Sequence, residues 1–171
     1  MMSNNGSVQT RDGSRYPAAA AWCIDLLPSR VREGKGDKAE KVDLIGHDRL
    51  DISARHDPAR VLALLREANQ DWAERNAGGC VWLFQLGDGS GDPCLAVGVR
   101  GAVGALTWYA KPGRFVPTNG MNNEYVDYWT WFGHESPMRP GAEVPVEQAY
   151  AALEELIRTH QRPTCVEWVA G

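Results

Sequence analysis

Residues 80–109 read CVWLFQLGDGSGDPCLAVGVRGAVGALTWY. The stretch contains three short apolar runs, rich in β-branched and aromatic residues, over 80–86, 94–100 and 102–109. A glycine-rich segment separates the first two runs, and Gly101 alone separates the last two. Short runs of this composition, bounded by glycine turns, are typical of β-strands joined by hairpins. The stretch therefore predicts a three-stranded antiparallel meander.

Two helix patterns flank the predicted meander. The first helix is predicted to begin at Asp57-Pro58, because Asp caps free N–H groups and Pro suits the first helical position. The apolar stripe of this helix consists of Val61, Leu65, Ala68 and Trp72. Residues 76–79 (NAGG) end it. A second amphipathic helix is predicted from Val146 to about His160, ahead of a proline that a helix seldom reaches.

The remaining C-terminal segments complete the predicted sheet. Further strands are expected over 124–132 (EYVDYWTWF) and 164–169 (TCVEWV), with loops over 111–123 and 133–145. Connections this short favour antiparallel neighbours. We therefore expect an α+β fold, with a mostly antiparallel sheet of about five to seven strands and two main helices packed on it.

The N-terminal part of the chain carries weaker signals. Residues 1–17 are rich in Ser, Asn and Gly and have no apolar periodicity, which predicts a disordered leader. Apolar runs at 21–27 and 42–45 are candidates for additional short strands. Residues 18–171 are expected to form a single domain, because 171 residues lie within the usual size of one domain.

Composition limits the function classes. A formal net charge of −4 argues against direct binding to nucleic acid or to an anionic membrane, since both require a basic face, but it permits binding to a basic protein. The four cysteines contain no CxxC pair, so no zinc site is predicted. The chain has neither a signal-peptide pattern nor an apolar run of about 18 residues. We therefore expect a cytoplasmic protein with reduced thiols and no metal.

Two motifs invite an enzymatic interpretation. Glycines 98, 101 and 104 do not match a phosphate-binding loop, because a strand follows them where such a loop requires a helix. A tight hairpin explains them better, and no cofactor is predicted. The best enzyme-like pair is His134 and Glu135, which lie in a predicted loop. A small hydrolase or transferase that uses this pair remains the alternative function, although a loop His beside Glu is usually only solvated.

Acidic and aromatic residues gather after the meander. Between residues 115 and 157 there are seven Asp and Glu residues but a single base, Arg139. Alternation along a strand over 124–132 places Tyr125, Asp127, Trp129 and Trp131 on one side, and Val126, Tyr128, Thr130 and Phe132 on a side that suits the core. A face that mixes a carboxylate with three rings is typical of a protein interface. The predicted partner-binding residues are Glu124, Tyr125, Asp127, Trp129, Trp131 and Glu135. The alternative is a strand buried on both faces, with one surface Asp.

The C-terminal third also carries motifs of a known family. They are Val144-Pro145-Val146-Glu147-Gln148-Ala149, Ala152-Leu153-Glu154-Glu155-Leu156, Arg162-Pro163 and Val166-Glu167-Trp168. Together with residues 95–98 and 104–108, they make the stretch 57–171 resemble the immunity protein one family of bacterial polymorphic-toxin systems. The chain departs from the family pattern at His160-Gln161, where a glycine usually precedes the basic-Pro pair.

The resemblance implies a binding protein without catalytic residues of its own, which neutralises a toxin encoded beside it. Such toxins are often nucleic-acid-modifying enzymes, for example deaminases. An enzyme that acts on nucleic acid tends to carry a basic cleft, and an acidic, aromatic surface is complementary to it. We therefore expect an immunity protein that forms a one-to-one complex with a cognate secreted toxin and occludes its active or substrate-binding cleft.

Overall fold

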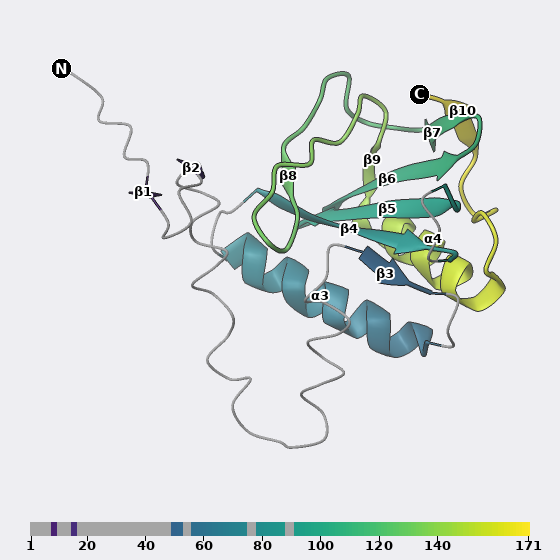
Figure 1. Cartoon of the computed structure of the whole chain (residues 1–171), viewed down its shortest axis with the longest axis horizontal. Coiled ribbons are helices and arrows are strands. Elements are labelled where there is room, and N and C mark those ends of the chain that lie inside the picture. Colours follow the sequence, from purple (N-terminus) through teal and green to yellow (C-terminus); the bar gives the residue numbers. More distant parts are fainter. Residues whose placement is uncertain (1–7, 10–14, 17–48, 53–55, 75–77, 88–90) are drawn as a thin grey trace.

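A computed structural model describes residues 8–9, 15–16, 49–52, 56–74, 78–87 and 91–171. Its centre is an eight-stranded sheet in the spatial order β10-β7-β6-β5-β4-β3, with β8 paired to β4 and β9 paired to β6. The strands are β3 (Arg49–Asp51), β4 (Gly79–Gln85), β5 (Cys94–Arg100), β6 (Val103–Ala110), β7 (Gly113–Pro117), β8 (Tyr128–Trp129), β9 (Glu143–Pro145) and β10 (Trp168–Ala170). Helices α3 (Pro58–Glu74) and α4 (Val146–Thr159) lie on the same face of the sheet (Figure 1). The predicted α+β architecture is confirmed, with slightly more strands than expected.

The predicted meander forms the middle of the sheet. β4, β5 and β6 are antiparallel neighbours, with Val81 opposite Gly98 and Gly98 opposite Ala105. β3 instead runs parallel to β4, and α3 connects the two strands. Parallel neighbours require such a crossover, which a hairpin cannot supply. The crossover places α3 against the sheet before the meander begins.

The two helices bury the larger core against the sheet. Asp57 begins α3 as predicted, because its side chain accepts a hydrogen bond from the Ala59 N–H at 3.1 Å. The apolar stripes of α3 and α4 meet a row of fully buried sheet side chains that includes Trp82, Leu95 and Leu106. Neither helix in the described part of the chain is long and apolar enough to cross a membrane.

The opposite face of the sheet is covered by residues 118–142, which connect β7 to β9 and which we call the excursion. A second, smaller cluster of buried residues lies beneath it and consists of Val81, Ala96, Ala105, Val116, Tyr128, Met138 and Ala142. The sheet is therefore sandwiched between two helices and a long, largely irregular connection (Figure 1).

The predicted strand over 124–132 is wrong. Only Tyr128–Trp129 has strand conformation, and the chain then reverses at a turn in which the Gly133 N–H donates to the Thr130 carbonyl at 2.9 Å. Gly133 has a φ of 79°, a left-handed conformation that glycine adopts without steric penalty. The returning chain pairs with the outgoing one at Val126–Met138 and Trp129–Glu135. This part of the excursion is a short hairpin, which we call the hairpin 126–138.

Other boundaries also differ from the prediction. The expected loops 111–123 and 133–145 contain β7 and β9, and the expected strand 164–169 is reduced to β10. The candidate strands at 21–27 and 42–45 lie outside the described residues. Of the leader, only β1 (Val8–Gln9) and β2 (Arg15–Tyr16) are described, and they form a separate antiparallel pair. The division between a leader and a domain at residue 18 remains a prediction.

Glycines 98, 101 and 104 of the meander are required for different structural reasons. Gly101, with a φ of 65°, forms the predicted tight hairpin between β5 and β6. Gly98 and Gly104 lie inside strands, where no turn requires them. A Cβ atom at Gly98 would lie 2.6 Å from the Tyr128 ring, and one at Gly104 would lie 2.5 Å from the Ala149 Cβ. These two positions therefore allow the excursion and α4 to approach opposite faces of the sheet.

The segment between α4 and β10 is held against the helix by Glu155. Its carboxylate accepts hydrogen bonds from the Thr164 hydroxyl and N–H and from the Cys165 N–H, at 2.6 to 3.0 Å. The hydrogen bonds from Thr164 lower the pKa of Glu155 to about 2. His160 ends α4 in the left-handed conformation, with a φ of 55°, and its N–H donates to the Leu156 carbonyl. A histidine thus occupies the kind of C-cap position that glycine favours.

Candidate protein-binding surface

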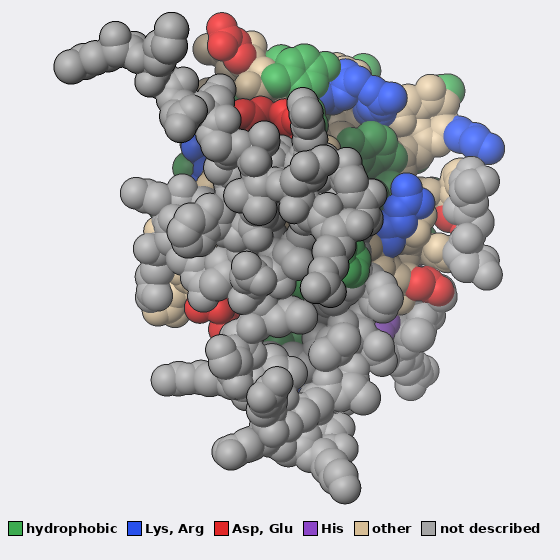
Figure 2. Space-filling view, turned by 60° about the vertical axis from the view of Figure 1, so that its left-hand side comes forward, with side chains coloured by type: hydrophobic (Ala, Val, Ile, Leu, Met, Phe, Trp, Pro, Cys, Tyr) green, Lys and Arg blue, Asp and Glu red, His purple; other side chains and the backbone are tan. Residues whose placement is uncertain are grey.

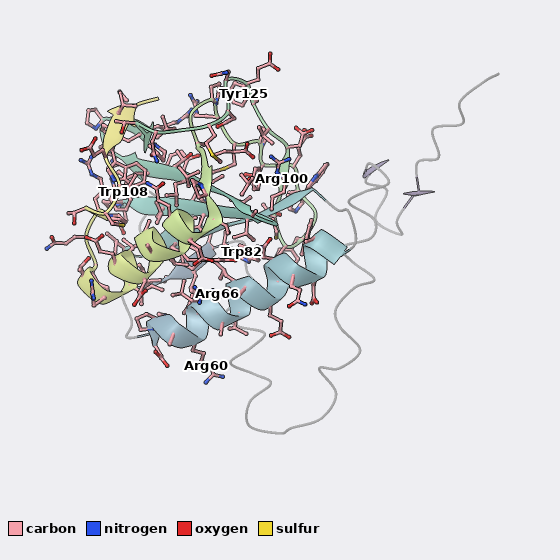
Figure 3. All side chains as sticks on the ribbon, turned by 180° about the vertical axis from the view of Figure 1, so that it is seen from behind. Arg60, Arg66, Trp82, Arg100, Trp108 and Tyr125 are labelled. Carbon is pink, nitrogen blue, oxygen red and sulfur yellow. The ribbon has the colours of Figure 1, made fainter. Side chains whose placement is uncertain are left out.

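The excursion carries most of the exposed large hydrophobic side chains in the described part of the chain. Met121, Tyr125 and Phe132 are 49%, 59% and 48% exposed, and the fourth such residue, Val169, lies on β10. Figure 3 places Tyr125 at the outer end of the molecule, away from the two helices. Hydrophobic groups that gather on one exposed segment are typical of a binding surface, whereas single scattered ones are ordinary.

Carboxylates accompany these hydrophobic side chains. Glu124, Asp127 and Glu135 are exposed, and the only Lys or Arg of the excursion is the half-buried Arg139. At the top of the face drawn in Figure 2, a hydrophobic patch adjoins acidic side chains on one side and Lys or Arg side chains on the other. The excursion thus combines apolar anchors with negative charge.

The two predicted tryptophan anchors have a second role. Trp129 and Trp131 are half-buried, and both pack against the larger core. The Trp129 ring also lies over Gly78, where a Cβ would be 3.3 Å from it. The sequence offered two interpretations of these tryptophans, a fully exposed face or a strand buried on both faces. Neither is correct, because one part of each side chain packs against the core and another part is exposed.

The turn at residues 130–133 changes the exposure of side chains that were predicted to face the core. Tyr128 is fully buried, as expected for a core position, but Phe132 is 48% exposed, so its assignment to the core is wrong. The physical reason is that strict alternation ends where the strand ends. Phe132 is therefore exposed at the turn of the hairpin.

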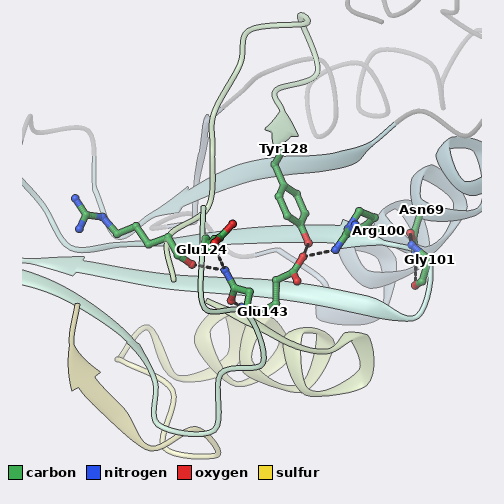
Figure 4. Close-up of polar contacts among 8 residues, drawn as sticks. Asn69, Arg100, Gly101, Glu124, Tyr128 and Glu143 are labelled. Atoms are coloured by element: carbon green, nitrogen blue, oxygen red, sulfur yellow. Dashed lines mark hydrogen bonds and ion pairs between the residues drawn. The ribbon is translucent and has the colours of Figure 1, made fainter. Parts of the chain in front are cut away.

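A buried polar junction lies beneath this surface. The Tyr128 hydroxyl donates to Glu143 Oε1 at 3.0 Å, and Arg100 Nη2 donates to the same oxygen at 2.6 Å (Figure 4). Glu143 is only 6% exposed, and burial raises the pKa of Tyr128 well above its usual value, with a further contribution from the Glu143 carboxylate. Tyr128 therefore remains a hydrogen-bond donor at physiological pH.

Asn122 closes the base of the excursion. Its amide nitrogen donates to the carbonyls of Glu124 and Arg139, both at 2.7 Å, and its side-chain oxygen accepts from the Glu143 N–H at 2.8 Å. Sequence reasoning missed Asn122 and Glu143, because one lies in a polar loop and the other was counted only as one more acid. One sequence feature could have identified Glu143: it is an acidic residue beside the apolar Val144, just before the second helix.

The alternative enzymatic pair, His134 and Glu135, lies on the hairpin 126–138. His134 and Glu135 are exposed on the returning side of the hairpin, where the His134 N–H donates to Thr130 Oγ1 at 3.2 Å. A hollow of about 270 Å³ lies elsewhere, lined by Gly91, Asp92 and residues 109–114. Within the described ranges, no three His, Cys, Asp or Glu side chains gather as a metal site requires.

Comparison with known proteins supplies the family. No curated protein sequence matches the chain, but the family model described as immunity protein Imm1 matches residues 46–170. The match spans the sheet from β3 to β10, both helices and the whole excursion. It confirms the resemblance found in the C-terminal motifs. The chain therefore belongs to the Imm1 family of immunity proteins, and the partner of such a protein is a toxin.

Proposed function

We propose that this immunity protein neutralises its toxin by inserting the excursion into the toxin's substrate cleft. The observation that carries the proposal is the combination of Met121, Tyr125 and Phe132 with three exposed carboxylates on one connection. The proposed site comprises the predicted residues Glu124, Tyr125, Asp127, Trp129, Trp131 and Glu135. We include Met121 and Phe132 because both are exposed on the same connection.

The chemistry of this surface favours a toxin that acts on nucleic acid, such as a deaminase. A cleft that binds phosphates is lined by Lys and Arg, and the carboxylates of the excursion are complementary to those cations. Aromatic side chains fit the pockets in which such enzymes stack or enclose bases. The immunity protein occupies the cleft in place of the substrate, and it acts in the cytoplasm, where the toxin would otherwise find its target.

The two kinds of side chain have different roles in this complex. Tyr125 and Phe132 act as anchors, and truncation of one of them weakens binding by about 2–4 kcal/mol, mainly through faster dissociation. Glu124, Asp127 and Glu135 raise the association rate, and their effect decreases as salt screens the charges. The complex is one-to-one and buries on the order of 1,200–2,000 Å².

The first experiment measures binding to the toxin domain encoded by the neighbouring reading frame. We expect Tyr125→Ala to raise Kd by at least about 30-fold while its melting temperature stays near that of the wild type, because the side chain is 59% exposed. Val169→Ala is the matched control, since Val169 is an exposed hydrophobic residue on β10 at 47% exposure. Equal effects of the two variants on Kd would contradict the proposed surface.

The second experiment tests occlusion of the cleft. If the excursion occupies the substrate site, an oligonucleotide substrate of the toxin competes with the immunity protein, and its apparent inhibition constant rises with substrate concentration. Light scattering on the purified complex tests the one-to-one stoichiometry. Inhibition that does not depend on substrate concentration would show that the immunity protein acts at another site on the toxin.

A further inference from the structure

Few backbone contacts attach the hairpin 126–138 to the sheet. Its backbone pairs with β4 only at Tyr128 and Trp129. Its remaining backbone hydrogen bonds are internal, including those between Val126 and Met138 and from the Ser136 N–H to the Tyr128 carbonyl. Internal bonds keep the shape of the hairpin but do not fix its position. Its position therefore depends on the side chains that reach the sheet.

Tyr128 is the central side chain of this attachment. Its ring lies over Gly79 and Gly98, on adjacent strands, so that a Cβ at either position would lie within 2.6 Å of a ring carbon. Its hydroxyl ends at the buried carboxylate of Glu143, on β9, which also binds Arg100 at the end of β5. One carboxylate thus joins the hairpin to two strands of the sheet.

We propose that Glu143 is a positioning residue for the toxin-binding surface, and that it holds the hairpin 126–138 against the sheet through the Tyr128 hydroxyl. A surface held in its bound shape loses less conformational entropy when the partner binds. Without this contact the hairpin opens locally while the sheet and helices stay folded, because local opening follows the weakest attachment. The consequence for toxin binding rests on the function proposed above, whereas the opening itself does not.

Hydrogen exchange of the free immunity protein tests the proposal. Tyr128→Phe removes only the hydroxyl, and we expect it to speed exchange of the hairpin amides at least about tenfold, the lower end of the effect of one hydrogen bond to a charged group. The reporter amides are those of Val126, Thr130, Ser136 and Met138. Exchange in β5 and α4 is expected to change by less than about twofold, because the opening is local.

Two further variants separate positioning from general stability. Glu143→Gln keeps an oxygen that accepts from Tyr128 but loses the charge, so we expect it to speed exchange of the hairpin amides less than Tyr128→Phe does. Ile157→Val, on the core side of α4, lowers global stability without touching the junction, so it does not speed the hairpin amides selectively. Equal acceleration in the hairpin and in β5 of Tyr128→Phe, or no acceleration in the hairpin, would overturn the proposal.

A final measurement connects the opening to binding. The apparent Kd for the toxin rises by the inverse of the closed fraction. The closed fraction measured by exchange in each variant therefore predicts its Kd with no adjustable factor. If Tyr128→Phe opens the hairpin but the measured toxin Kd differs from the Kd calculated from the closed fraction, the role of Glu143 in toxin binding is wrong. The local attachment of the hairpin through Tyr128 would still be supported. If the toxin does not bind the excursion at all, the proposed function fails independently of the exchange result.

Discussion

Gly98→Ala tests whether Tyr128 lies directly on the sheet. The added Cβ would be 2.6 Å and 2.8 Å from two ring carbons of Tyr128, and 3.2 Å from the Ala105 Cβ. Carbon atoms in contact prefer about 3.5–4.0 Å, so the ring has to move by about 1 Å. Tyr128 is fully buried and its hydroxyl is bonded to Glu143, so a shift of the ring disturbs both its packing and this hydrogen bond.

The expected loss of stability has three terms. Overpacking in a core costs about 1–3 kcal/mol, and weakening the Tyr128 hydrogen bond adds about 1 kcal/mol. Replacing glycine restricts the unfolded chain, which offsets about 0.4–1 kcal/mol. We therefore expect Gly98→Ala to lower the free energy of unfolding by about 2–3 kcal/mol.

Urea unfolding followed by circular dichroism measures the effect. In a Tyr128→Val background the clashing ring atoms are absent, so Gly98→Ala is expected to be nearly neutral, and the double-mutant cycle gives the coupling energy. Gly113→Ala is the matched control, because a Cβ there meets no atom within 4 Å in the described structure. A Gly98→Ala variant as stable as the wild type, or one with no coupling to Tyr128, would refute this packing.

Two predictions concern the C-terminal end of α4 and the segment between α4 and β10. His160→Gly is expected to raise the free energy of unfolding by about 0.5–1 kcal/mol, because His160 occupies a left-handed C-cap; a thermal melt that shows no rise relative to His160→Ala would contradict it. The pKa of Glu155 is lowered to about 2, so its hydrogen bonds stabilise the fold above its ordinary pKa of 4.5 and are lost as pH falls towards 2. Between these pH values the unfolding free energy of Glu155→Gln therefore falls less steeply with acidification than that of the wild type. The difference is small because the carboxylate is solvated. If urea unfolding gives the same pH dependence for both proteins, the prediction is wrong.

Local patterns predicted the helices and the meander well. Two signals of the first helix, the apolar stripe that includes Val61 and Leu65 and the cap at Asp57, each involve residues only a few positions apart. They therefore do not depend on distant parts of the chain. The apolar runs around Trp82 and Leu106 likewise report burial directly. The parallel pairing of β3 with β4 was not predicted, since parallel neighbours meet only after an intervening helix has folded back.

The candidate surface was predicted in part. The residues of 124–135 were selected for their charge and aromatic content, and the structure places Glu124, Tyr125 and Asp127 on the exposed excursion. The exposure of Phe132 was missed, because a turn at Gly133 interrupts a sequence that alternates like a strand. Glycine at that position was the only local sign of the reversal.

Periodicity, capping and charge depend on neighbouring residues, so they were sufficient to predict the fold class, the order of the main elements and the acidic, aromatic character of one segment. Which side chains of that segment face solvent and which face the core depends on contacts with distant parts of the chain. Tyr128 is buried because Gly79 and Gly98, 49 and 30 residues upstream, leave room for its ring and because Glu143 accepts its hydroxyl. Such contacts depend on the pairing of strands, and residue spacing along the chain does not specify which distant groups the pairing brings together.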